Sequence, residues 1–325
     1  MIEAPAVLSL FGNESVRATW EPLLTQFSGL IMTLDNADVE IDNLTPHLPD
    51  FRPQIAIISS DLYPVQGGNI IHRLRMRYPL MEIVVLAFKE ANHIPLWALV
   101  NDNVHHLSVA DPAKESGIIR ALLQTLTANA PWELSSYLSP ESDFCEFHLF
   151  DPGEKERIIH NIENLVSGSA ADLEILRHKC ALLADEMIEN ALESAPSGAI
   201  SQQGIMVRAG FDGESLAIQV KDNWGTLTPE KALEHLARQQ DGQTCVDQSR
   251  GRGLFILWQF FDHFHVNITS GKETTIGGQL RRKSNPVAGQ LKGFDFFHNP
   301  LSRQLRSYCS KLRPQEDMLY AGSQS

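Results

Sequence analysis

The sequence lacks the features that mark several common classes of protein. Its four cysteines form no CxxC pair, so neither a zinc knuckle nor a disulfide framework is predicted. Its longest purely apolar runs, such as residues 83–88, are far shorter than the ~20 residues that a bilayer-crossing helix needs. The N-terminus has no basic segment and no small-residue cleavage site after its short apolar run. We therefore expect no secretory signal, no membrane span and a cytoplasmic location.

Positive charge is also scarce. The chain has 27 Lys and Arg against 40 Asp and Glu, a net charge of −13, which disfavours a nucleic-acid binder because phosphate backbones would be repelled. Residues 281–325 are the exception, with eight basic and three acidic residues. This basic segment either docks on the acidic body or on a partner, or forms a solvated surface.

The length of 325 residues and the 43% hydrophobic content predict two globular domains. In the first half, short apolar runs rich in β-branched residues are separated by stretches with helical spacing. The runs are residues 6–11, 29–34, 55–59, 83–88 and 106–109. This alternation predicts an α/β domain over residues 1–128, with a flavodoxin-like, doubly wound parallel sheet.

The segment IAIISSDLYPVQGG resembles the third strand and following loop of a response-regulator receiver domain. In that family the phosphoacceptor Asp stands four residues before a Pro, and here that position is Ser60, four residues before Pro64. Asp61 is one step out of register, and one step turns a strand side chain to the opposite face. The resemblance implies a receiver-like domain whose phosphoacceptor has been lost.

Two further receiver features are also missing. Phe11 and Gly12 follow the first strand where the family has its acidic metal-binding pair, and Asp111 precedes Pro112 where the family has a Lys. An aspartyl phosphate needs a carboxylate, acids that hold Mg²⁺ and a cation. We interpret the domain as a pseudo-receiver that acts by protein contact, with phosphorylation of Asp61, or a purely structural role, as the alternatives.

A Pro- and Ser-containing stretch without steady periodicity, residues 129–141, is interpreted as a linker. Downstream, expected strands at 145–150, 205–209, 216–221, 265–269 and 274–280 accompany expected helices at 152–166 and 170–194. This order predicts an α+β sandwich over residues 142–285, with helices on one face of a mixed sheet. Residues 286–325 are expected to form a basic, aromatic tail that packs on the domain or anchors a partner.

Several residues of the second domain have the chemistry of a nucleotide site. Glu186 and Asn190 are four residues apart on the long helix, so their side chains can address one metal ion and one polarised hydroxyl. Asp222 ends an apolar strand and is followed by Gly225, so it can accept a hydrogen bond from the exocyclic amine of a flat ring. In the last hairpin, a hydroxyl of the Thr274–Thr275 pair, assigned to Thr275, is expected to reach the same ligand.

A glycine-containing helix start completes this pattern. In SRGRGLFILWQFF, Gly251 and Gly253 precede an apolar helix, where backbone N–H groups can approach phosphate oxygens. Arg250 and Arg252 are candidates to balance the phosphate charge. Each motif is common singly, but their order within about a hundred residues is much less so.

Together these motifs resemble the ATP-binding domain of the GHKL superfamily, which histidine kinases, gyrase-type ATPases and anti-sigma-factor serine kinases share (the Bergerat fold). EMIENALES is similar to the family's N-box, VKDNWG to its first glycine box and GRGLFIL to its second. The resemblance implies that Glu186 is the general base, that Asn190 ligates Mg²⁺ and that Asp222 reads adenine N6. It also implies that Gly251 and Gly253 wrap the phosphates of ATP.

The chain departs from the family at two motifs. Trp224 and Thr226 replace the two glycines of the usual first box, with Gly225 between them, and Ser194 replaces the N-box His. Residues 228–250 are expected to form the nucleotide lid, and the polar stretch LARQQDGQTCVDQS within it, residues 236–249, has no obvious lysine for a γ-phosphate. Binding of ATP is therefore better supported than its turnover.

The arrangement narrows the choice of superfamily member. No dimerising hairpin with a phosphoacceptor His precedes the ATP domain, and only about forty residues follow it. The chain thus looks closest to the anti-sigma serine kinases, which phosphorylate a small antagonist protein and sequester a partner. The alternatives are a non-catalytic nucleotide-sensing adaptor and a packed scaffold that binds no small molecule; a homodimer is compatible with each.

Overall fold

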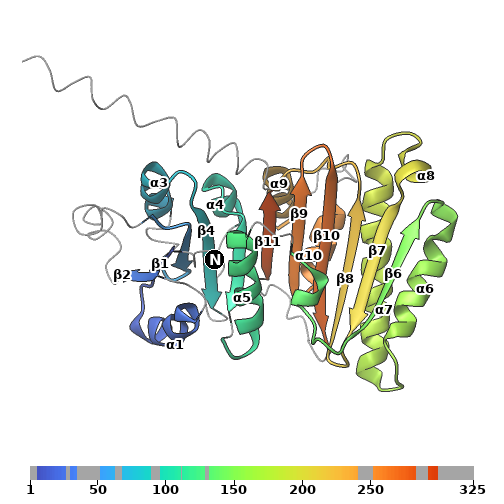
Figure 1. Ribbon diagram of the computed structural model, residues 1–325, viewed down its shortest axis with the longest axis horizontal. Helices are drawn as coiled ribbons and strands as arrows, with labels where there is room; N and C mark the ends of the chain where they lie inside the picture. The colour runs from blue at the N-terminus through green and yellow to red at the C-terminus, as the bar shows by residue number, and fades with distance from the viewer. Residues whose placement is uncertain are drawn as a thin grey trace, which may run out of the picture.

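The computed structural model describes residues 6–26, 30–34, 52–62, 68–88, 96–110, 112–128, 132–240, 252–282 and 292–298. The strands of these residues form one eleven-stranded sheet with the order β2-β1-β3-β4-β5-β11-β9-β10-β8-β7-β6 (Figure 1). Buried apolar clusters lie on both faces of this sheet. In the described part of the chain, no helix is both long enough and apolar enough to cross a bilayer.

The N-terminal half has the predicted flavodoxin-like fold. Its strands are β1 (Ala6–Leu10), β2 (Leu30–Leu34), β3 (Ile55–Ser59), β4 (Glu82–Phe88) and β5 (His106–Ala110). All neighbours among them pair in parallel, in the order 2-1-3-4-5 that defines one of the two common doubly wound sheets. Its helices are α1 (Glu14–Thr25), α3 (Gly68–Arg77), α4 (Leu96–Asn101) and α5 (Pro112–Ala128).

Burial on both faces explains why these strands are continuous apolar runs. Along β3, Ile55 and Ile57 belong to the cluster under α1 and α5, whereas Ala56 and Ile58 belong to the cluster under α3 and α4. Successive side chains of a strand point to opposite faces, so a strand covered on both sides needs apolar residues at every position.

The C-terminal half is an antiparallel run of strands with helices on one face. In chain order its elements are β6 (Asp143–Leu149), α6 (Lys155–Leu165), α7 (Ala171–Ser194), β7 (Ile205–Phe211), β8 (Ser215–Asp222), α9 (Pro229–Gln240), α10 (Arg252–Phe260), β9 (His263–Thr269) and β10 (Glu273–Arg281), with short helical turns η3 (Pro152–Glu154) and α8 (Ala199–Gln203). Helix α7 packs on β8 and against α6 and α10. The strand boundaries agree with those expected from the sequence to within two residues.

The expected tail contains an internal strand. Strand β11 (Gly293–His298) pairs in parallel with β9 and antiparallel with β5, and it joins the sheets of the two halves (Figure 1). Phe294, Phe296 and Phe297 are buried. Without β11, both β5 and β9 would present an unpaired edge, and one strand satisfies both. The predicted division at residue 286 therefore separates β11 from the sheet to which it belongs.

The expected linker is also packed. Trp132 and Tyr137 are buried with Leu134 of the turn η2 (Leu134–Ser136), and all three belong to the cluster that α1 and α5 cover. The Asn267 amide donates to Trp132 O and accepts from Trp132 N. From residue 132 onward, the connection is therefore part of the core between the two halves.

Candidate functional site

Helix α7 presents Glu186 and Asn190 on one side, one turn apart. The Asn190 amide donates to the Glu186 backbone carbonyl at 2.7 Å and lies 3.5 Å from the Glu186 carboxylate. The neighbouring pair, Asp185 and Glu189, is held by Lys155 of α6. Lys155 thus neutralises the adjacent acids and leaves Glu186 beside Asn190.

The start of α10 closes over this acid–amide pair. A side chain at Gly253 would overlap the Glu186 carboxylate and the Asn190 amide, so only glycine allows the helix to approach them. Burial, with the charge of Asp185, raises the pKa of Glu186, and the charge of Arg252 opposes that rise. Gly253 and Arg252 therefore lie in the first turn of α10, next to Glu186 and Asn190, whereas Arg250 and Gly251 are outside the described residues.

Asp222 lies at the end of β8, where one of its carboxylate oxygens accepts hydrogen bonds from the backbone and the other accepts none from the described residues. Its Oδ1 accepts the backbone N–H groups of Trp224, Gly225 and Thr274 at 3.0, 3.1 and 3.2 Å. Its Oδ2 has no partner among the described residues. Burial raises the pKa of this carboxyl, and the three N–H donors oppose that shift. The backbone thus fixes the orientation of a carboxylate with one free acceptor.

One cavity of about 370 Å³ brings Asn190 of α7 and Asp222 of β8 together, whereas Glu186, Arg252 and Gly253 are not among its lining residues. Asn190, Asp222 and Thr274 line it beside an apolar wall that includes Met187, Val220, Leu254 and Ile276. The buried hydroxyl of Thr274 has no hydrogen-bond partner in the part of the chain that the structure describes. The volume is within the 300–1,000 Å³ range of small-molecule sites. An apolar slot with an acceptor and an unsatisfied hydroxyl suits a flat, polar-edged ring.

Thr275 is not part of this cavity. Thr274 and Ile276 line it, and the side chains of β10 alternate between faces, which places Thr275 on the opposite face of the sheet. The predicted hydroxyl contact is therefore reassigned to Thr274. The sequence could not distinguish the two threonines, because the register of the hairpin decides which one faces α7.

Gly225 has a different role from the one expected. Its φ is +54°, and a side chain there would overlap the backbone of Thr269, Lys272 and Glu273 in the β9–β10 turn. The Gly271 N–H donates to its carbonyl at 3.0 Å. The space beside Gly225 is therefore filled by the hairpin and is not free for a ligand ring.

Trp224 does not fill the cavity. Its indole is buried, and its Nε1–H donates to Ser194 Oγ at 2.9 Å. Ser194 therefore holds the Trp224 indole in place, and Trp224 is not among the residues that line the cavity.

Helix α9 contributes two residues that the sequence analysis missed. Lys231 and His235, one turn apart, line the cavity, and Lys231 has no ion pair among the described residues. The residues Thr228 and Pro229 signal a helix start, and the Lys231 N–H indeed donates to Thr228 Oγ1 at 3.3 Å. That signal locates α9 but not the cavity beside it. The rest of the expected lid, residues 241–250, lies outside the described residues.

The N-terminal half offers a sparser site at the carboxyl ends of its strands. Ser60 is buried after β3, and Asp61 is exposed with its carboxylate close to Gly12, which follows β1. The Asp61 carboxylate therefore points toward the first loop, although its offset of one residue predicted the opposite face. Among the described residues, no cluster of three or more His, Cys, Asp or Glu could hold a metal ion.

Comparisons with known proteins return solved receiver domains. The isolated receiver domain of RcsB from Salmonella enterica serovar Typhimurium is 18% identical, covering 38% of this chain and 90% of that chain, with a TM-score of 0.29. Chemotaxis protein CheY4 of Vibrio cholerae is 17% identical over 37% of this chain and 98% of that chain (TM-score 0.30). A signal receiver domain of an HD-domain protein from Pseudomonas fluorescens Pf-5 is 14% identical over 40% and 93% (TM-score 0.33). No family model and no curated protein matches the chain.

Proposed function

We propose that the C-terminal half binds ATP with Mg²⁺ and that the chain is a signalling regulator whose N-terminal half acts by protein contact. The observation that carries the proposal is the cavity between α7, β8, β10 and α9. It combines a buried carboxylate with one free oxygen, a buried hydroxyl without a partner and an amide beside a second carboxylate. Unsatisfied buried polar atoms are rare in folded proteins, and a ligand accounts for them.

Each polar residue of the cavity has a distinct task in this proposal. The free oxygen of Asp222 accepts a hydrogen bond from the exocyclic amine of adenine, which selects against a ring that offers only an acceptor there. Oxygen ligands suit Mg²⁺, and the Asn190 side chain supplies one. Lys231 and Arg252, with the N–H groups at the start of α10, neutralise phosphate charge.

Calorimetry of the full chain with ATP and Mg²⁺ tests the binding proposal, with Asp222→Asn as the diagnostic variant. The Asn carbonyl can still accept the three backbone N–H groups, but its amide now opposes the adenine amine. We expect at least tenfold weaker binding, about 1.4 kcal/mol or more. Asp212→Asn is the matched control, since Asp212 caps the β7–β8 turn in the same way, remote from the cavity. Absence of ATP binding by the wild type, or equal affinity of both variants, would contradict the proposal.

A second function, phosphoryl transfer to a Ser or Thr of a protein partner, is favoured by the surroundings of Glu186. Lys155 engages the two adjacent acids, and burial raises the pKa of Glu186 toward the range of a general base. This is the chemistry of an anti-sigma-type switch, in which a sigma-factor-like regulator or its antagonist is the partner. In such a reaction most catalysis is positioning and charge neutralisation.

Turnover separates this switch from a non-catalytic nucleotide sensor. We expect γ-phosphate loss or transfer from ATP to fall at least 100-fold in Glu186→Gln while ATP affinity changes by less than threefold. Glu189→Gln is the control on the same helix, because Lys155 keeps its bond to Asp185. Tight ATP binding without turnover in the wild type would leave the sensor as the function.

A further inference from the structure

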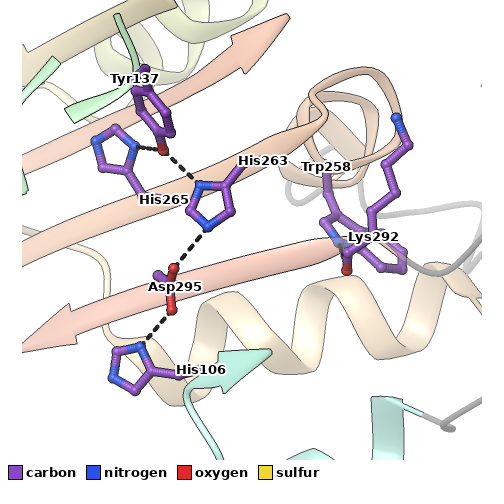
Figure 2. Close-up of polar contacts among 7 residues, drawn as sticks. All are labelled: His106, Tyr137, Trp258, His263, His265, Lys292 and Asp295. Carbon is purple, nitrogen blue, oxygen red and sulfur yellow. Dashed lines mark hydrogen bonds and ion pairs between the residues drawn. The ribbon is translucent and has the colours of Figure 1, made fainter. Parts of the chain in front are cut away.

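Strand β11 carries a fully buried acid into the junction between the two halves. Asp295 is 0% exposed, and each of its carboxylate oxygens lies 2.8 Å from a ring nitrogen, His106 Nδ1 of β5 on one side and His263 Nε2 of β9 on the other (Figure 2). One side chain of the inserted strand therefore connects the sheets of both halves.

The polar chain continues beyond His263. The hydroxyl of Tyr137 lies 2.8 Å from His263 Nδ1 and 2.7 Å from His265 Nδ1 (Figure 2). The Asp295 carboxylate can only accept, so both of its histidine partners donate to it. Tyr137 has a single hydrogen, so it donates to one ring and accepts from the other. Burial alone would raise the pKa of Asp295, but the hydrogen bonds from His106 and His263 hold it below its ordinary value.

The backbone pairing of β11 is strongly asymmetric. It runs beside β9 over six residue pairs, from Gly293 opposite His263 to His298 opposite Ile268. Beside β5 it has two, Phe294 with Leu107 and Asp295 with His106. The side of β11 that faces β9 therefore has the longer ladder, and β11 belongs to the C-terminal half.

The contact of β11 itself with β5 is short and partly polar, while an apolar cluster and the packing of α9 on α4 also join the two halves. The Phe296 N–H donates to His105 O at 2.9 Å, and the Phe297 ring packs on His106 with centroids 5.2 Å apart. Beside it, a crevice of about 60 Å³ is lined mainly by polar residues, among them Asn103 and Glu230. Interfaces between domains that move relative to each other are typically more polar than cores.

We propose that the two halves separate along the line between β5 and β11, and that Asp295, held by His106, is the lock that keeps this line closed. In the closed state both ring donors and both carboxylate oxygens are satisfied without water. Removing one partner leaves a buried polar group without its bond, which favours the open state, where water supplies that bond. In the open state β11 stays on β9, and the edge of β5 that it covered meets water.

Native-state hydrogen exchange of the wild-type full chain tests the proposal without any substitution. We expect the amides of β5 and α4 to exchange through an opening that leaves β9, β10 and β11 protected. Their exchange should be at least tenfold faster than that of β9 under the same conditions. Exchange of β5, β9 and β11 as one cooperative unit would overturn the proposal.

Two substitutions then test the lock itself. In Asp295→Asn and in His106→Asn, exchange of β5 and α4 should rise at least tenfold further, and the radius of gyration from X-ray scattering should increase. Asp262→Asn is the control, since Asp262 accepts from the Arg281 N–H at 2.7 Å beside β9 but outside the junction. Unchanged exchange of β5 in both variants, or equal loss of protection in β9, would show that Asp295 is not the lock. His106→Asn keeps the bond between Asp295 and His263, so it decides the matter if Asp295→Asn does not fold.

Discussion

Gly225 and Gly213 both have a positive φ, but their surroundings differ. Gly225, at +54°, is packed against the backbone of the β9–β10 turn, whereas Gly213, at +90°, has open space where a side chain would be. A side chain at Gly213 therefore meets only the backbone strain of the left-handed region. At Gly225 it meets the same strain and also displaces the hairpin that supplies Thr274 to the cavity.

We therefore predict that Gly225→Ala lowers the free energy of unfolding by about 3 kcal/mol, against about 1 kcal/mol for Gly213→Ala. Urea unfolding of both variants measures the difference, which isolates the contact with the hairpin from the strain. Ligand affinity should fall only in Gly225→Ala, since that substitution moves β10. Equal destabilisation by the two substitutions would show that the hairpin does not pack against Gly225.

At the scale of single elements, α9 connects the cavity with the N-terminal half. Ala232, Leu233 and Leu236 are buried, and the helix packs against α4, α10 and β11. Lys231 and His235 line the cavity. One helix therefore lines the cavity and also packs against the N-terminal half.

The charge of α9 gives a prediction about phosphate recognition. We expect Lys231→Met to weaken ATP binding about tenfold and adenosine binding less than twofold, because adenosine has no phosphate for the lysine to neutralise. Calorimetry with ATP, ADP, AMP and adenosine measures the increment for each phosphate. Arg238→Met is the control cation on the same helix, where Arg238 pairs with Glu234 at 3.3 Å. If Lys231→Met still binds ATP more tightly than adenosine by the same factor as the wild type, Lys231 does not contact the phosphates. That result would not affect the proposal that the cavity binds adenine.

For the whole molecule, the continuous sheet buries its histidines at the junction between the halves. His265 is 0% exposed, and burial, with a smaller effect of His263, lowers its pKa to about 3. Its Nε2 has no partner among the described residues, so a proton there would be a buried donor without an acceptor. Burial likewise lowers the pKa of His105 to about 4.

These two histidine shifts favour unfolding as the pH falls from 6.5 toward 4, whereas the raised pKa values of Glu186 and Asp222 act in the opposite direction. Below pH 6.5 the unfolded chain binds protons at these rings and the folded chain does not, so each pH unit favours unfolding. For His265 the loss is about 1.4 kcal/mol per unit, and His105 adds to it in the same direction. Asp295 contributes only below its ordinary pKa of 3.8, outside this window.

Urea unfolding between pH 7 and pH 4.5 measures this dependence. His265→Gln should be less stable than the wild type at pH 7, because it loses the bond to Tyr137, but its stability should fall less steeply with acid. His160→Gln is the control, since the His160 ring is exposed on α6. A slope unchanged in His265→Gln would show that this ring does not remain neutral in the folded protein.

The sequence by itself determined ten of the eleven strands that the structure describes, β1 to β10, and the helices α6 and α7. A strand such as β3, apolar at every position, and a helix such as α7, with apolar residues every three or four positions, can bury those side chains in only one way. Local spacing also placed Glu186 and Asn190 on one side of α7, because the pitch of a helix fixes the direction of residues four apart. The position of Asp222 at the end of a strand could be predicted for a similar reason, because it follows a continuous apolar run.

Only the tertiary structure decided where β11 lies, which threonine faces the cavity and what Gly225 contacts. Each depends on pairing between segments far apart in the chain, and the same local pattern fits several registers. From its sequence, the segment GFDFFH is compatible with packing on the domain or with anchoring a partner. The structure shows that its acid, Asp295, has hydrogen-bond partners in His106 and His263. Those two residues are 189 and 32 positions away, so no local spacing brings them to Asp295.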